Sequence, residues 1–214
     1  MSNYSWPNYR GNVYHAGLSV VSGPIKPYVF FKFQTTGAII SSPAVDSNGN
    51  IYFGTSGAGF YKLSSNGTEL WQYPSTNNLV ASPALNRKET LVYVGDNTGF
   101  DVFALFTATG KMKWTTFVGV GVTSSPYYYE PFSGGRDQVF VALSNGDIRV
   151  FDANNGDVLS SFSPGIGSIV YSSPIVFNGV VFVGVSSAFS FIGLNISVPT
   201  SGILSCLQLA LSIR

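Results

Sequence analysis

Short apolar runs alternate with turn signals along most of the chain. Four runs rich in β-branched and aromatic residues end at a small residue and lie at residues 51–54, 92–95, 139–142 and 181–184. Runs this short and this apolar predict strands that are covered on both faces. Further strands are predicted at 60–63, 102–105 and 148–151, and at 69–73, 112–115 and 158–162. The region shows no convincing helical period.

A Ser-Pro motif recurs at the start of each set of strands. Ser-Ser-Pro-Ala at residues 41–44 returns as Ala-Ser-Pro-Ala at 81–84, Ser-Ser-Pro-Tyr at 124–127 and Ser-Ser-Pro-Ile at 172–175. The four prolines are 40, 43 and 48 residues apart, which is typical of a four-stranded propeller blade. Asn-Gly pairs between the predicted strands favour the tight turns of antiparallel hairpins. The sequence therefore predicts an all-β fold, a β-propeller of four-stranded antiparallel blades.

The repeats divide the chain into a lead-in at 1–27, a propeller region at 28–194 and an apolar tail at 195–214. Three full blades are expected at about 39–74, 79–117 and 122–163. A fourth at 169–194 is expected to stop after its third strand, and residues 30–33 to supply the last strand of a preceding blade. Closed propellers have about four to eight blades. We therefore expect an incomplete propeller with partial blades at both ends, whose open edges can self-associate.

One segment carries a recognisable signature. Ala104, Gly110 and Trp114 lie in a stretch that resembles the tryptophan-docking repeat of quinoproteins, Ala-x-Asp-x-x-Thr-Gly-x-x-x-Trp, and Gly67 and Trp71 keep the same spacing. Together with the lead-in motif near residues 6–19, this pattern is similar to the PQQ-like repeat family of β-propellers. The resemblance implies that each indole packs on the peptide beside a glycine of the neighbouring blade.

The third copy departs from the signature. It keeps Asp152 and Gly156 but has Ser160 at the tryptophan position. A serine cannot fill the space of an indole, so we expect weaker docking after the third blade.

Charge and composition limit the functions that the chain can perform. Charged residues make up 10% of the chain, the net charge is +1 and Lys and Arg are scattered, so nucleic-acid binding is not expected. No apolar run is long enough for a transmembrane helix. Cys206 is the single cysteine, which excludes an intrachain disulfide. The N-terminus lacks the features of a signal peptide, so a cytoplasmic location is the default expectation, although related repeat proteins are often exported.

The resemblance also raises the question of catalysis. Quinoprotein dehydrogenases of this kind hold PQQ with Ca²⁺ and use an aspartate as general base. In this chain the carboxylates mostly flank turns, where they cap the backbone, and His15 is the single histidine and lies outside the blades. We therefore expect no catalytic residue, no metal site and no cofactor.

One connection is longer than its counterparts in the first two blades. It holds the aromatic residues and the arginine that we select as a candidate interaction loop: Tyr127, Tyr128, Tyr129, Phe132 and Arg136. Insertions in repeat proteins often form binding elements. The alternative is that the tyrosine run extends the first strand of the blade and packs.

The favoured function is a non-catalytic scaffold that binds a protein partner. One alternative is a fragment of a PQQ-dependent dehydrogenase whose catalytic blades are missing. Another is a truncated product without independent function, in which case the tail at 195–214 is an artefact of the reading frame. If the tail is functional, it can cover an exposed edge or anchor a partner as a short helix or strand.

Overall fold

Sixteen strands form four separate four-stranded sheets in the described part of the chain. The computed structural model describes residues 6–11, 17–18, 26, 28–131, 134–163, 172–177, 180–185, 190–197 and 205–209, with only the backbone for residue 185 and from residue 190 onward. Within each sheet, strands that follow one another in sequence are antiparallel neighbours. No helix among these residues is long and apolar enough to cross a membrane.

The strands fall into the four sheets in chain order. The first sheet contains β1 (Ala44–Val45), β2 (Ile51–Gly54), β3 (Phe60–Leu63) and β4 (Glu69–Tyr73). The second contains β5 (Ala84–Leu85), β6 (Leu91–Gly95), β7 (Asp101–Phe106) and β8 (Met112–Phe117). The third contains β9 (Tyr127–Tyr129), β10 (Gln138–Ala142), β11 (Ile148–Asp152) and β12 (Val158–Phe162). The fourth contains β13 (Ile175–Phe177), β14 (Val180–Val185), β15 (Ser190–Ser197) and β16 (Ser205–Leu209).

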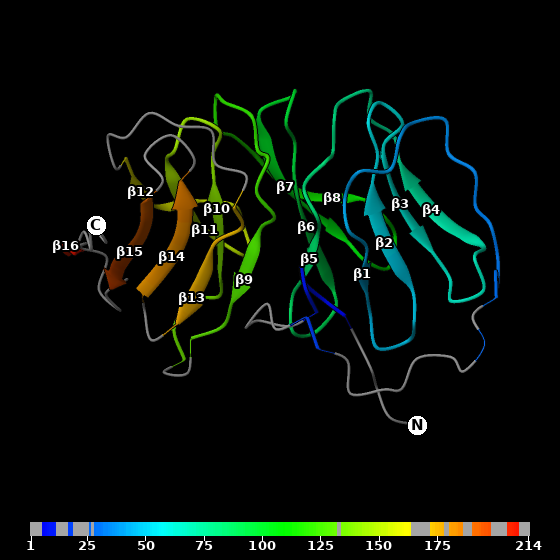
Figure 1. Ribbon diagram of the computed structural model, residues 1–214, viewed down its shortest axis with the longest axis horizontal. Helices are drawn as coiled ribbons and strands as arrows, with labels where there is room; N and C mark the ends of the chain where they lie inside the picture. The colour runs from blue at the N-terminus through cyan, green and yellow to red at the C-terminus, as the bar shows by residue number, and fades with distance from the viewer. Residues whose placement is uncertain are drawn as a thin grey trace.

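The sheets stand side by side as an arc, with the first and fourth at its two ends (Figure 1). Apolar side chains fill the spaces between them. One cluster joins the first and second sheets through residues such as Tyr52 and Leu105, another joins the second and third, and another joins the third and fourth. Because the inner strands of the internal sheets are covered on both faces, strands such as β6 carry continuous apolar runs, whereas the outer strand β8 is mostly exposed. The chain is an incomplete β-propeller, as the sequence predicted.

The same irregularity recurs in three of the sheets. The register of the third strand against the fourth shifts between Lys62 and Leu63, between Ala104 and Leu105, and between Val150 and Phe151. A bulge at the same point of each repeat strengthens the local twist of the outer strand. The repeat seen in the sequence therefore recurs in the structure.

The two ends of the chain differ from the sequence-based expectation. The fourth sheet was expected to stop near Leu194, with 195–214 outside the repeat. Instead, β15 continues to Ser197, and β16, which lies in the expected tail, pairs with it as a fourth strand. At the other end, residues 30–33 form no strand. Phe31 and Phe33 nevertheless pack on the free face of the first sheet.

The lead-in contributes to the first two sheets. Trp6 exchanges two backbone hydrogen bonds with Val45 of β1, at 2.7 and 2.8 Å, and the Pro7 carbonyl accepts one from the Leu85 amide at 2.8 Å. Residues 6 and 7 therefore tie β1 to β5, the first strands of two neighbouring sheets.

Candidate functional site

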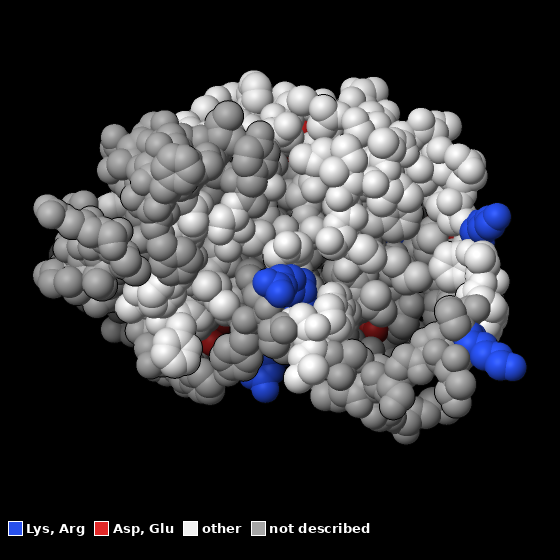
Figure 2. Space-filling view, in the orientation of Figure 1, with Lys and Arg blue, Asp and Glu red and all other residues white. Residues whose placement is uncertain are grey.

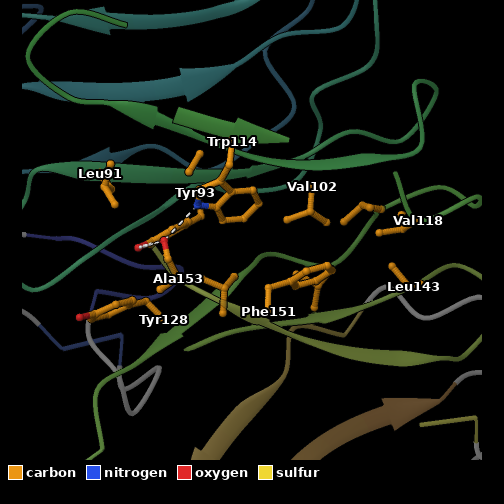
Figure 3. Close-up of a cluster of buried hydrophobic side chains, with 13 residues drawn as sticks. Leu91, Tyr93, Val102, Trp114, Val118, Tyr128, Leu143, Phe151 and Ala153 are labelled. Carbon is orange, nitrogen blue, oxygen red and sulfur yellow. Dashed lines mark hydrogen bonds between the residues drawn. The ribbon is translucent and has the colours of Figure 1, made fainter. Parts of the chain in front are cut away.

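The contact between the second and third sheets is centred on Trp114. Its Nε1 donates a hydrogen bond to the Ala153 carbonyl at 3.0 Å, and its ring stacks on Phe151 (Figure 3). A Cβ added to Gly156 would lie 2.6 Å from the indole. Gly156 has a φ of +79°, which side-chain-bearing residues rarely adopt. The indole thus lies directly on the glycine turn of the next sheet.

Trp71 makes the equivalent contact between the first and second sheets. Its Nε1 donates to the Thr107 carbonyl at 2.9 Å, and a Cβ on Gly110 would lie 2.8 Å from its ring. Ala104 is buried opposite Trp114 in the neighbouring strand. Every residue that the sequence selected for blade docking therefore lies at a contact of this kind, apart from Gly67, whose partner was not foreseen.

That partner is Phe31. A Cβ on Gly67, which has a φ of +87°, would overlap the Phe31 ring. Phe31 lies 40 residues before Trp71, one repeat length away. The spacing could have revealed it, but a phenylalanine without a preceding Thr-Gly does not match the docking signature. Phe31 therefore takes the place of an indole on the free face of the first sheet.

A lysine also lies at the first interface, which the sequence did not suggest. The Lys62 Nζ donates to the Thr107 carbonyl at 2.9 Å and lies 5.1 Å from the centre of the Tyr52 ring. Lys62 pairs with Trp71 in the first sheet as Ala104 pairs with Trp114 in the second. Burial lowers the pKa of Lys62 because the ammonium group loses water, although the charge of Asp46 opposes this shift.

Lys62→Met is expected to raise the free energy of unfolding by about 1 kcal/mol at neutral pH. Thr107 keeps the hydrogen bond from Trp71, and no charge remains to be desolvated. The pKa of Lys62 is lower in the folded chain than in the unfolded chain. Between these two pKa values the unfolded chain binds more protons, so the stability of the wild type rises with pH. Urea titrations should therefore show the advantage of methionine shrinking toward about pH 10. An advantage independent of pH would contradict this role.

The predicted interaction loop divides into a buried and an exposed part. Tyr127 and Tyr128 belong to β9 and are only 2% and 6% exposed. The Tyr127 hydroxyl donates to the Val176 carbonyl of the fourth sheet at 3.3 Å, and the Tyr128 ring stacks on Tyr93 of the second. These rings join sheets and are not available to a partner, so the contact-loop interpretation fails for them. A strand covered on both faces buries consecutive side chains.

The Tyr128 hydroxyl also has a defined partner. It donates to Asp137 Oδ2 at 2.8 Å. Burial and the neighbouring Asp137 carboxylate raise the pKa of Tyr128, so the phenol keeps its proton and the hydrogen bond persists.

The exposed part consists of a charged corner between two sheets. Arg87, in the β5–β6 connection of the second sheet, forms an ion pair with Glu130 at 2.9 Å. Arg136 lies 3.7 Å from Asp152, and its side chain is 70% exposed. Tyr129 is half-buried beside them. We call Arg87, Tyr129, Glu130 and Arg136 the corner surface. Phe132 lies outside the described residues.

The buried carboxylates hold turns. Asp46 accepts hydrogen bonds from the amides of Asn48 and Asn50 at 3.0 and 2.8 Å, and Asp96 accepts two of the same kind from the residues that follow it. Ca²⁺ needs about six to eight convergent oxygens. Within the described ranges, no three His, Cys, Asp or Glu side chains gather as a metal site. These carboxylates do not fit the Ca²⁺ that the resemblance implies for dehydrogenases. His15 and the side chain of Cys206 are not described.

Positive charge is dispersed over the visible surface. On the described part of the face in Figure 2, Lys and Arg side chains lie singly among uncharged residues. At the corner surface, Arg87 and Arg136 are each paired with a carboxylate, Glu130 and Asp152 respectively.

Solved structures share this fold at low sequence identity. Quinohemoprotein alcohol dehydrogenase from Comamonas testosteroni matches with a TM-score of 0.66 and 16% identity over 98% of this chain and 42% of that chain. The WD40 repeats of RRP9 match with a TM-score of 0.63 and 10% identity over 82% of this chain and 52% of that chain. The computationally designed Ika4 protein matches with a TM-score of 0.55 and 15% identity over 83% of this chain and 94% of that chain. The chain thus spans less than half the length of the dehydrogenase.

The family assignment rests on a different comparison. No curated protein matches the chain. Residues 23–192 match the family model described as outer membrane protein assembly factor BamB, which is more than half of the sequence. The chain therefore belongs to this family of PQQ-like repeat β-propellers.

Proposed function

We propose that the chain is a non-catalytic propeller scaffold that binds a protein partner through the corner surface. The observation that carries the proposal is how the polar groups are used. Asp46 and Asp96 hold turns and the docking indoles join sheets. At the corner surface, by contrast, the side chains of Arg87 and Arg136 are 77% and 70% exposed. Exposed arginine and tyrosine side chains are frequent anchors of protein interfaces.

The corner also has a suitable position for recognition. Arg87 comes from the second sheet, whereas Glu130 and Arg136 flank the long connection of the third. A partner that contacts all three would read two blades at once, and the rigid sheets would hold the charges in place. The family description, an outer membrane assembly factor, favours a partner in the cell envelope.

The proposal is tested by capture with matched variants. The immobilised chain, the double variant Arg87→Glu/Arg136→Glu and the control Lys32→Glu are exposed to the same membrane-protein extract. Lys32 is exposed in the segment that packs on the free face of the first sheet, away from the corner between the second and third sheets. We expect wild type and control to retain a common protein that the double variant loses by about tenfold or more. Equal retention by all three would place the contact elsewhere.

The dehydrogenase alternative is tested separately. Purified chain is mixed with PQQ and Ca²⁺, and quinone absorbance and dye reduction are recorded. The scaffold proposal expects neither a saturable absorbance change nor turnover. Saturable PQQ binding would overturn it in favour of a dehydrogenase fragment. A chain that is aggregated or unfolded after purification would instead favour a product without independent function.

A further inference from the structure

The charged side chains are distributed unequally between the surface and the interior. All Asp and Glu residues, and all Lys and Arg residues except Arg214, belong to the described part of the chain. Every described Lys and Arg is exposed apart from Lys62 and Arg149. The acids show the opposite distribution, and the exposed ones are Glu69, Glu130 and Asp157. On the described part of the face in Figure 2, Lys and Arg side chains protrude, whereas Asp and Glu atoms are seen only in recesses.

The buried acids are occupied by the chain itself. Besides the turn amides, Asp46 accepts a hydrogen bond from the Tyr52 hydroxyl at 2.8 Å, and Asp96 accepts one from Asn77 Nδ2 at 2.6 Å. Carboxylate oxygens that already accept hydrogen bonds inside the fold are not available to a partner. At close range a partner therefore meets mainly Lys and Arg side chains, although the net charge of the whole chain is only +1.

The turn that carries Arg87 shows this separation of charges clearly. In the β5–β6 connection, the Glu89 carboxylate is directed to the first sheet, where both of its oxygens lie 3.0 Å from the Ser47 amide and one also accepts the Ser47 hydroxyl. Glu89 holds a φ of +55°, a left-handed conformation that side-chain-bearing residues rarely adopt. Arg87 and Lys88 precede it and are exposed. The turn thus directs its acid inward and its two cations outward.

The β9–β10 connection adds a second exposed guanidinium group. Arg136 lies 3.7 Å from Asp152, which is too far for a hydrogen bond, and Asp152 is buried and accepts the Asn154 amide at 2.8 Å. The neighbouring Asp137 accepts the Tyr128 hydroxyl. No described residue accepts a hydrogen bond from the Arg136 guanidinium, so its donors remain available.

The two connections meet at the corner surface. Arg87 pairs with Glu130, and the Arg87 backbone also contributes a hydrogen bond to the Tyr128 hydroxyl, which donates to Asp137. Glu130 is the one exposed acid among the described residues of these two connections. Exposed cations from both sheets therefore surround a single accessible carboxylate.

We propose that the corner surface, together with Lys88, binds an acidic segment of the partner, a stretch of polypeptide in which several Asp or Glu side chains are exposed together. The inference rests on the proposed function and names the chemistry of the partner. Carboxylates of the segment pair with Lys88 and Arg136 and compete with Glu130 for Arg87. Guanidinium groups suit this role because each can bind a carboxylate through two parallel hydrogen bonds.

The distribution of the other cations favours a polypeptide over a nucleic acid or a lipid surface. A phosphate backbone or an anionic membrane is bound by a continuous basic face. On the described part of the face in Figure 2, however, Lys and Arg side chains lie singly. A short acidic segment needs only the few cations that the two connections bring together.

Fluorescence anisotropy with defined peptides tests the inference. The probes are a labelled peptide of about ten residues in which Glu and Ser alternate, and its counterpart in which Lys replaces Glu. At about 50 mM salt the Glu peptide should bind saturably and the Lys peptide should not. Arg136→Glu and Lys88→Glu should each weaken binding about fivefold, and Arg87→Glu/Arg136→Glu about tenfold or more. Lys32→Glu makes the same change of charge away from the corner and should have an effect of less than about twofold.

Glu130→Gln provides a test in the opposite direction. The substitution removes the acid that competes for Arg87, so it should tighten binding of the Glu peptide about twofold to threefold. The inference would be overturned by a Glu peptide that does not bind, by equal weakening from Lys32→Glu and Arg136→Glu, or by a loss of binding in Glu130→Gln. Binding to vesicles of anionic phospholipid in preference to the Glu peptide would overturn it in favour of a lipid surface.

The capture experiment separates this inference from the proposed function. If Arg87→Glu/Arg136→Glu loses the captured protein but the Glu peptide does not bind the wild type, the scaffold stands and the acidic chemistry of its partner is wrong. If the Glu peptide binds at the corner but all variants capture the same proteins equally, the acidic-segment site stands and the proposed function fails. Melting curves of all variants establish that each one folds.

Discussion

Trp114→Ala is expected to lower the free energy of unfolding by about 3–5 kcal/mol, the usual cost of removing a buried aromatic side chain. The indole is buried between the second and third sheets, stacks on Phe151 and lies on Gly156. Alanine leaves a cavity between the two sheets. It also removes the donor to the Ala153 carbonyl, although the Tyr93 hydroxyl still donates to that oxygen at 3.2 Å.

Urea titration measures this loss of stability, and two spectroscopic probes follow the two halves of the arc separately. Met112→Ala is the matched control, because Met112 lies on the same strand with an exposed side chain; it should cost about 0.5 kcal/mol or less. The Trp114 variant should also separate the transitions of the two halves of the arc, since the interface that couples them is damaged. A loss equal to that of Met112→Ala would mean that the indole does not hold the sheets together.

The docking contacts show which features a sequence reveals on its own. Trp71, Gly110, Trp114 and Gly156 were identified because the contact needs two rare residue types at fixed spacing, a large flat ring and a glycine with positive φ. The Ser-Pro period revealed the arrangement of sheets for a similar reason. A contact that demands particular residues leaves a pattern that survives in the sequence.

Other contacts leave no such pattern. Lys62 stands in the first sheet at the register position that Ala104 has in the second, but this becomes visible only when the register and the bulge of the third strand are known. Tyr127 and Tyr128 share a composition with binding loops, and only their burial against the fourth and second sheets shows that both faces of their strand are covered. Aromatic residues serve cores and interfaces alike, so their type does not decide between the two.

The last strand was missed because its spacing departs from the repeat. The connection from Ser197 to Ser205 is longer than the glycine turns that join the third and fourth strands of the other sheets. Apolar residues near the end of a chain fit a short helix as well as a strand. Pairing with β15 is a tertiary contact, which local sequence does not encode.

Gly156→Ala is expected to cost about 2–4 kcal/mol, because it adds overpacking to backbone strain. The new Cβ would lie 2.6 Å from the Trp114 ring, at a φ of +79°. Gly134→Ala provides the matched control: its φ is +73°, but no described atom lies within 4 Å of the added Cβ. The control should therefore lose only about 1–2 kcal/mol, the cost of the left-handed backbone.

The double variant Trp114→Ala/Gly156→Ala completes the cycle. Once the indole is gone, the added methyl group meets a cavity, so the two losses should add up to more than the loss of the double variant by about 1 kcal/mol or more. Trp114→Ala/Gly134→Ala should be additive, since Gly134 makes no such contact. Additivity in both pairs would show that the ring and the glycine act independently. If only the Gly156 double variant loses less stability than the sum of its two single variants, the difference measures the direct contact that holds one blade against the next.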